Sequence, residues 1–237
     1  MKNKAIYTPI PTFLLHGFLD DKKRADVIND IISYAVYYHT ERLSGDYHRA
    51  HEILCISCEN EKEQYNRGKK IAAEVPSKSF YELELSSLFN IRDNSHTQKY
   101  LENFLMYHAL RSMQGVKMYY RGTNLFVASR MDGHDSKVTD ECELSPEIKK
   151  ICTRRRMETK REELSVKYGV SFYIPKNLHG FYYSTRLTLE ELIEAVLTKD
   201  ERKKNGKVSL AELSRKKEEE ILERLRNKRD KKSNGRC

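Results

Sequence analysis

The sequence predicts an α+β protein that is predominantly helical, with two helix-plus-β-hairpin units and a charged C-terminal helix. Three observations lead to this expectation. Apolar residues recur at helical spacing through much of the 237-residue chain. Two segments, at 116–131 and 170–186, alternate apolar and polar residues around a turn. From Lys199 onward, charged residues dominate the composition.

Helices are expected first in the N-terminal half of the chain, because apolar residues there are spaced by three and four. They cover residues 22–43, 47–57, 60–74 and 96–114. The last of these is apolar around most of its circumference, which predicts a helix at the centre of the fold. The segment 79–91 is ambiguous, since its first half alternates like a strand and its second half has a helical face.

The two alternating segments share a pattern. Each follows Gly-Val, contains Asn-Leu in its turn and ends at an arginine, Arg130 or Arg186. Both are expected to be β-hairpins. An internal duplication and the common geometry of any two hairpins both account for the likeness. In the second segment, Val170, Phe172 and Ile174 are expected to face inward, and Tyr173, Tyr182 and Arg186 outward.

Between and after these segments, further helices are expected. One begins at Ser145 and Pro146, runs to about residue 168 and is broken near Thr159. Capping boxes at 188–191 and 209–212 predict two more, the second of them charged. The expected domains are an N-terminal helical domain at 1–131, a linker at 132–144, a helix–hairpin–helix unit at 145–198 and a basic helical tail at 199–237.

A helix followed by a hairpin resembles the end of a winged-helix domain, in which one helix enters the major groove of DNA and the hairpin touches the flanking backbone. One such arrangement places the recognition helix at 96–114 and the wing at 116–131. Its DNA-facing residues would be Ser95, His96, Gln98, Lys99, Asn103, Lys117, Arg121 and Asn124. The alternative is a core helix packed on a hairpin. In the second unit, 164–171 resembles part of a helix-turn-helix, but Pro175 and the aromatic run favour a hairpin.

The charge is unevenly distributed. The chain carries 44 Lys and Arg against 35 Asp and Glu, a net charge of +9. Residues 199–237 hold 15 basic and 8 acidic residues, so this tail supplies +7 of that excess. Such a tail favours anionic partners, nucleic acid above all, and the alternative is a solvated tail that aids solubility. The expected nucleic-acid contacts are Arg154, Arg155, Arg156, Lys160, Arg161, Lys99, Arg121 and Arg186.

No motif fixes a reaction. The chain lacks phosphate-binding loops, nucleophile elbows and zinc-protease motifs. Two clusters have side chains of the types that bind metals or transfer protons. They are His48, His51, Cys55 and Cys58, and Asp132, His134 and Asp135. Four ligands on one straight helix cannot surround one zinc ion, and the acidic cluster has the composition of a turn. We therefore expect no metal, no cofactor and no enzymatic activity.

Taken together, the sequence predicts a cytoplasmic, non-enzymatic nucleic-acid-binding protein, with DNA as its ligand, acting as a regulator or as a replication or mobilisation accessory. No secretory signal or membrane span is expected, because the apolar run near the N-terminus is short and interrupted by Pro9 and Pro11. The alternative is an interaction or structural protein whose aromatic hairpins bind a protein partner or a second copy of the chain.

Overall fold

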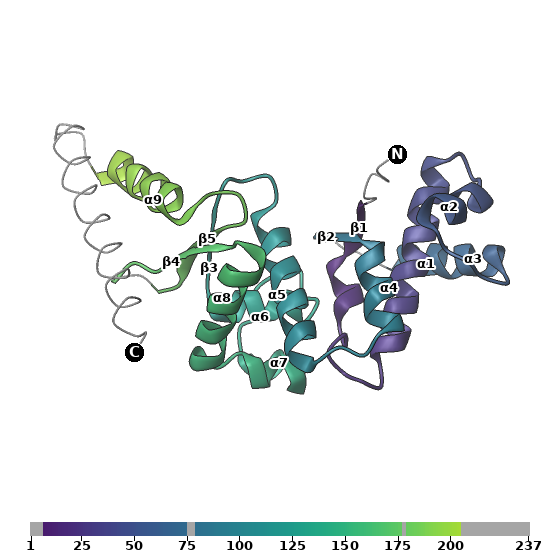
Figure 1. Cartoon of the computed structure of the whole chain (residues 1–237), viewed down its shortest axis with the longest axis horizontal. Helices are drawn as coiled ribbons and strands as arrows, with labels where there is room; N and C mark the ends of the chain where they lie inside the picture. Colours follow the sequence, from purple (N-terminus) through teal and green to yellow (C-terminus); the bar gives the residue numbers. More distant parts are fainter. Residues whose placement is uncertain (1–6, 75–78, 177–178, 205–237) are drawn as a thin grey trace, which may run out of the picture. The chain divides into compact units, whose positions relative to one another are not determined.

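The computed structural model describes residues 7–74, 79–176 and 179–204. It confirms an α+β fold that is predominantly helical, with two small antiparallel sheets in the described part (Figure 1). The chain divides into two compact units, Met1–Arg186 and Leu187–Cys237. The boundary between the units thus lies after the second hairpin, whereas the linker expected at 132–144 lies inside the first unit.

The expected N-terminal helices are all present. They are α1 (Arg24–Arg42), α2 (Tyr47–Leu54) and α3 (Glu61–Glu74), and a short 3₁₀ helix, η1 (Thr12–Leu15), precedes them. The three α-helices pack against one another. Asp46 caps α2, because its carboxylate accepts a hydrogen bond from the backbone N–H of Arg49 at 2.9 Å.

The ambiguous segment contains both of the structures that its pattern suggested. Strand β2 (Phe80–Glu84) is followed at once by helix α4 (Leu85–Asp93). Strand β2 pairs in antiparallel register with β1 (Tyr7–Pro11), a strand that the sequence did not reveal. The alternate residues Ile10, Tyr81 and Leu83 are fully buried, so one face of this ribbon joins the core.

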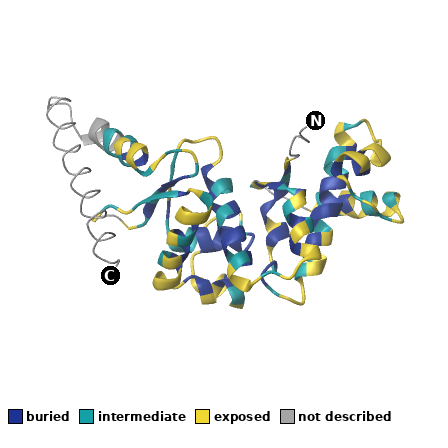
Figure 2. Ribbon diagram, in the orientation of Figure 1, coloured by how far each residue is buried: buried dark blue, intermediate teal, exposed yellow. Residues whose placement is uncertain are grey.

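Helix α5 (Gln98–Gln114) lies at the centre of the fold, as its apolar circumference predicted. It contacts β2, α6 and α8 and buries residues on most of its faces, which Figure 2 shows in dark blue. The side chain of Thr97 caps its start by accepting from the N–H of Tyr100. Gly115 ends the helix with φ of +55°, a conformation that favours glycine.

The hairpin expected at 116–131 is wrong in its second arm. Strand β3 (Tyr120–Gly122) is followed by helix α6 (Asn124–Met131). The hydroxyl of Thr123 accepts from the N–H of Phe126 at 3.2 Å, so the expected turn is a helix cap. Val127, Ala128 and Met131 then fall on one buried face of the helix. The two similar segments are therefore not two copies of one hairpin.

Residues after α6 lead to two more helices through a short 3₁₀ turn, η2 (Glu141–Glu143). Helix α7 (Pro146–Ile151) begins at the expected serine and proline. The break in the expected long helix comes at Cys152 and Thr153 rather than near Thr159, because α8 (Arg154–Tyr168) starts there and continues unbroken. Gly169 ends α8 in the left-handed conformation.

The second hairpin is confirmed. Strands β4 (Ser171–Tyr173) and β5 (Phe181–Ser184) pair in antiparallel register, and β3 adds to the other side of β5. The strand order is therefore β3-β5-β4. The similar segments of the sequence thus meet in one sheet, where Tyr120 is paired with Tyr183. A Cβ on Gly180 would lie 2.4 Å from the carbonyl oxygen of Gly122, so only glycine fits this turn.

The second compact unit contains α9 (Leu189–Lys204). The predicted capping box is present, since Thr188 Oγ1 accepts from the N–H of Glu191 and the Glu191 carboxylate accepts from the N–H of Thr188. The charged helix expected from residue 209 lies outside the described residues. Within the described residues, no helix is both long and apolar enough to cross a membrane.

Candidate nucleic-acid interface

A cluster of basic side chains lies where α7 meets α8. Arg154, Arg155 and Arg156 form the exposed first turn of α8, and Lys149 and Lys150 lie in the last turn of α7. We call these five residues the α7–α8 basic cluster. The break at Cys152 and Thr153 places the start of one helix next to the end of the other, so these five exposed cations lie on one short stretch of the chain.

Parts of this cluster are held in place by the chain itself. Arg154 Nε donates to Glu158 Oε1 at 3.0 Å, and Arg156 Nη1 donates to the carbonyl oxygen of Lys150 at the same distance. Lys149 Nζ donates to the carbonyl oxygen of Cys142 at 2.9 Å. The Arg155 side chain is exposed. The start of a helix carries partial positive charge, so three arginines there add to a field that already attracts anions.

Lys160 and Arg161 do not belong to this surface, although the sequence placed them among the expected contacts. Lys160 is 7% exposed, and its ammonium group lies 2.7 Å from Glu102 Oε2 of α5. Arg161 is 6% exposed. Its guanidinium lies 4.8 Å above the ring of Phe181 and donates to Asn124 Oδ1 at 2.8 Å. Burial lowers the pKa of Arg161. Both cations therefore hold α8 to its neighbours.

Lys99, another expected contact, is linked to Lys160 because both lie close to the carboxylate of Glu163. Its ammonium group lies 2.7 Å from Glu163 Oε1, and Asn103 Nδ2 donates to Glu163 Oε2 at 2.8 Å. Burial alone would raise the pKa of Glu163. The hydrogen bonds from Lys99 and Asn103 and the charge of Lys160 outweigh it, so this pKa lies below its usual value. Asn103 is buried, so α5 serves as a core helix here and not as an exposed reading helix.

Arg121 of β3 and Arg186, just after β5, donate to backbone carbonyl groups. Arg186 donates to the carbonyl oxygens of Val116 and Gly115, each at 2.8 Å, and so fixes the connection between α5 and β3. Arg121 donates to the carbonyl oxygen of His179 at 3.2 Å, which ties β3 to the turn between β4 and β5. Both side chains remain exposed. Arg121 is thus held next to His179.

The faces of the hairpin are divided largely as the alternation predicted. Phe172 and Tyr183 are paired across β4 and β5 and join the core. Tyr173 and Tyr182 are paired on the opposite face, and Arg121 of β3 is paired with Tyr182. This opposite face therefore carries a row of two tyrosines and one arginine across the three strands. Ile174, expected to face inward, is 55% exposed beyond the end of β4.

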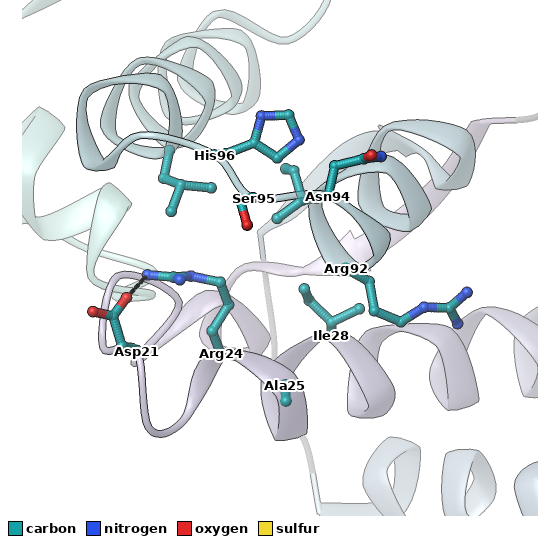
Figure 3. A pocket seen from close by; sticks show the side chains of 10 residues that line it. Asp21, Arg24, Ala25, Ile28, Arg92, Asn94, Ser95 and His96 are labelled. Carbon is teal, nitrogen blue, oxygen red and sulfur yellow. Dashed lines mark hydrogen bonds and ion pairs between the residues drawn. The ribbon is translucent and has the colours of Figure 1, made fainter.

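A pocket of about 340 Å³ lies between the start of α1, the end of α4 and the start of α5 (Figure 3). Ser95 and His96, two of the expected DNA-facing residues, line it. Several of its polar groups are engaged within the chain. Arg24 binds Asp21 at 2.6 Å, as the dashed line in Figure 3 marks, and His96 Nε2 lies 2.7 Å from Asn90 Oδ1. With an apolar floor that includes Ile28, the pocket does not single out one ligand chemistry.

The acidic cluster after α6 begins with a turn, as its composition indicated, and Asp132 makes contacts there that the sequence did not predict. Asp132 is buried, and its carboxylate accepts from the N–H and the hydroxyl of Ser145 at 2.6 and 2.7 Å. His16 Nδ1 lies 3.4 Å and His134 Nε2 3.7 Å from this carboxylate. The hydrogen bond with Asp132 raises the pKa of His16. Across residues 7–74, 79–176 and 179–204, no three His, Cys, Asp or Glu side chains gather to hold a metal ion.

Comparison of the chain with protein-family models, with curated proteins and with solved structures finds no match. The function is therefore inferred from the geometry of the residues described above.

Proposed function

We propose that this chain is a non-enzymatic nucleic-acid-binding protein, with DNA as its expected ligand, that acts as a regulator or as a replication or mobilisation accessory. The observation that carries the proposal is the α7–α8 basic cluster. Three consecutive exposed arginines begin a helix that leads directly into the β4–β5 hairpin. In the proposed complex, the start of α8 contacts phosphate groups and the hairpin touches the backbone beside them.

The electrostatics of α8 support an anionic ligand. Cations near the start of a helix are unfavourable by about 0.3–1 kcal/mol each at the surface, because the helix dipole is positive there. Among the described contacts of the first turn of α8, one involves an acidic residue. This residue is Glu158, which forms an ion pair with Arg154. A phosphate group placed at the first turn would interact favourably with the arginines and with the exposed N–H groups of the helix.

The order of the elements supports the same proposal by analogy of fold. Strand β3 is followed by α6, α7 and α8 and then by the β4–β5 hairpin, with β5 in the middle of the sheet. Winged-helix domains use a similar plan, with two helices between the strand and the hairpin where this chain has three. The analogy places the recognition helix at α8 and the wing at the turn before β5, not at α5 and 116–131. Fold alone does not establish function, so the analogy only adds to the charge argument.

The exposed side of α8 has side chains that suit contacts with base edges. Arg155, Thr159 and Val166 fall on one side at helical spacing, and all three are exposed. Val166 is 86% exposed and adds a small apolar side chain to this side of the helix. Arginine pairs with guanine, and threonine and small apolar side chains contact the methyl group of thymine. The basic residues of 199–237 would add contacts that do not depend on sequence.

Fluorescence anisotropy with a labelled duplex of about 30 base pairs tests the proposal. The test variant replaces Arg154, Arg155 and Arg156 with alanine. The matched control replaces three exposed lysines of α3 with alanine, so the net charge changes equally. These lysines are Lys62, Lys69 and Lys70. We expect the test variant to lose about tenfold or more in affinity, and the slope of log K against log salt to fall by about 2, since Arg154 and Arg156 would contact phosphate groups and Arg155 a base edge.

Two results would contradict the proposal. One is a wild-type chain that binds neither duplex nor single-stranded nucleic acid at about 50 mM salt. The other is a test variant and a control variant with equal affinities and equal salt slopes. A chain shortened before residue 205 separates the contribution of the tail, since its removal should weaken binding without changing the difference between the two triple variants.

A protein-binding or self-associating role is the second candidate. The observation that favours it is a pair of exposed apolar side chains in the segment before β3. Val116 and Met118 are 91% and 53% exposed. Such side chains are typical of interaction surfaces when they lie together. Mass measurement in solution tests this role. A stable oligomer that is disrupted by Val116→Asp and Met118→Asp, and that does not bind nucleic acid, would favour it over the first candidate.

A further inference from the structure

A cysteine and a buried histidine lie together at the end of α2, far along the chain from the α7–α8 basic cluster. Cys58 Sγ is 3.5 Å from His51 Nε2. The imidazole of His51 is only 1% exposed, whereas Cys58 is half-buried and so partly open to solvent. A base within reach of a partly accessible thiol is the arrangement found in activated cysteine nucleophiles.

The other contacts of His51 fix its role. Its Nδ1 lies 2.7 Å from the carbonyl oxygen of Tyr47, which can only accept a hydrogen bond. In the neutral ring, Nδ1 therefore carries the hydrogen, and Nε2 presents its lone pair toward the thiol of Cys58. A third group thus orients the base, as in other nucleophile–base pairs.

Gln64 provides a partner for the ring after it has taken up a proton. Gln64 Oε1 lies 2.8 Å from the same Nε2. A protonated Nε2 can donate to this oxygen, while a neutral Nε2 has one lone pair, which accepts the thiol hydrogen of Cys58. The imidazole therefore has hydrogen-bond partners both before and after proton transfer from the thiol, even though it is buried.

We propose that Cys58 is a nucleophilic modification site for small electrophiles and hydroperoxides, with His51 as its positioned base. With an alkyl halide, the thiol proton passes to His51 Nε2, sulfur bonds to the carbon atom, and the halide leaves. With hydrogen peroxide, sulfur attacks one oxygen, the O–O bond breaks, and the departing hydroxide takes the proton from His51 to form water. The sulfur is oxidised to a sulfenic acid as the peroxide is reduced.

The other described cysteines supply references within the same molecule. Cys55 and Cys142 are exposed, and Cys55 is the C-cap residue of α2. Cys152 is buried, and burial together with Glu141 raises the pKa of its thiol to about 11. If exposure alone governed reactivity, Cys55 and Cys142 would react before Cys58. The proposal predicts the opposite order, with Cys152 the slowest of the four.

Competitive alkylation of the full chain tests the proposal. The protein is treated at pH 7 with limiting iodoacetamide, and the labelled fraction of each cysteine is followed by peptide mass spectrometry. We expect Cys58 to react about tenfold faster than Cys55 or Cys142, since a positioned base commonly contributes a factor of about 100 or more. A Cys58 rate at or below that of Cys55 would overturn the proposal.

The His51→Asn variant tests the base directly. Its amide NH₂ takes the place of Nδ1 and can still donate to the Tyr47 carbonyl, but no group replaces Nε2. We expect the ratio of Cys58 to Cys142 labelling to fall about tenfold, with Cys142 unchanged. An unchanged ratio in a variant that keeps the wild-type circular dichroism spectrum would overturn the proposal. If this variant does not fold, Gln64→Leu replaces it, because it keeps the base and removes the acceptor for the protonated ring. A ratio that Gln64→Leu does not lower would be equally contrary.

Discussion

Lys160 Nζ lies 2.7 Å from Glu102 Oε2, and this ion pair joins α8 to α5 inside the protein. A second carboxylate, Glu163 of α8, lies 3.6 Å from the same ammonium group. Lys160 is only 7% exposed. A residue from the most basic run of the sequence therefore packs α8 against α5. The cations of α8 thus fall into two groups, those that fix the helix to its neighbours and the arginines that it presents to solvent.

The Lys160→Met variant should be less stable by about 3 kcal/mol, because it leaves Glu102 and Glu163 largely buried without their cation. Urea denaturation at pH 7 measures the loss. Lys167→Met, at an exposed position of the same helix, should change the stability by no more than about 0.5 kcal/mol. The double variant Lys160→Met/Glu102→Leu should recover much of the loss, since an apolar pair can replace a buried ion pair. A single variant as stable as Lys167→Met would contradict this account.

Local patterns predicted most of the helices, and the reason is their periodicity. The apolar residues of α1 and α5 recur every three or four positions, so the buried face of each helix can be predicted without knowing which element packs against it. The capping box at Thr188 is likewise a local signal, and it is formed as expected. The second hairpin followed from its alternation and from the turn chemistry around Pro175.

The expectations that were wrong or missing concern segments whose structure depends on residues far away in the sequence. The segment after Gly122 has the composition of a hairpin, but Thr123 caps a helix whose apolar residues are buried against the core. Strand β1 contains two prolines and exists because β2, some seventy residues away, pairs with it. The sequence also could not distinguish the buried cations of α8 from the exposed ones. Arg155 and Lys160 lie in the same basic run, and only the packing of α5 places a carboxylate beside Lys160.

Gly68→Ala should destabilise the protein by about 2 kcal/mol or more, although alanine normally favours a helix over glycine by about 1 kcal/mol. The reason is the close approach of α3 and α1. A Cβ at this position would lie 2.0 Å from the carbonyl oxygen of Ser33 and 2.8 Å from Cβ of Tyr37. Thermal or urea denaturation measures the change. Asn66→Ala, at an exposed position two residues earlier, should be neutral or slightly stabilising. If Gly68→Ala behaved in the same way, the close approach of the helices would be wrong.

His108 should make the protein less stable in mild acid. Burial, and then the charge of Arg111, lowers the pKa of His108 to about 3. The unfolded chain binds a proton at this residue near pH 6.5, whereas the folded chain does so only near pH 3, so acidification between these values favours unfolding. At pH 5 this costs about 2 kcal/mol relative to pH 7.5. His108→Leu should remove that part of the pH dependence in urea denaturation at the two pH values. If variant and wild type lost the same stability between pH 7.5 and pH 5, His108 would not be the residue responsible.

Gln114→Leu should weaken the attachment of the three-stranded sheet to α5. Gln114 is 2% exposed, and its Nε2 donates to the carbonyl oxygens of Lys117 and Met118, each at 2.9 Å. Its Oε1 accepts from the N–H of Thr185 at 3.0 Å. Leucine fills a similar volume but leaves these backbone groups without that partner, so we expect the free energy of unfolding, measured by urea denaturation, to fall by about 2–3 kcal/mol.

Because Gln114 connects the end of β5 to the loop before β3, amide hydrogen exchange in the Gln114→Leu variant should increase first in the sheet and not in α1. Equal protection of the sheet in variant and wild type would argue against this role, and Arg111→Leu, at a half-buried position of the same helix, provides the comparison.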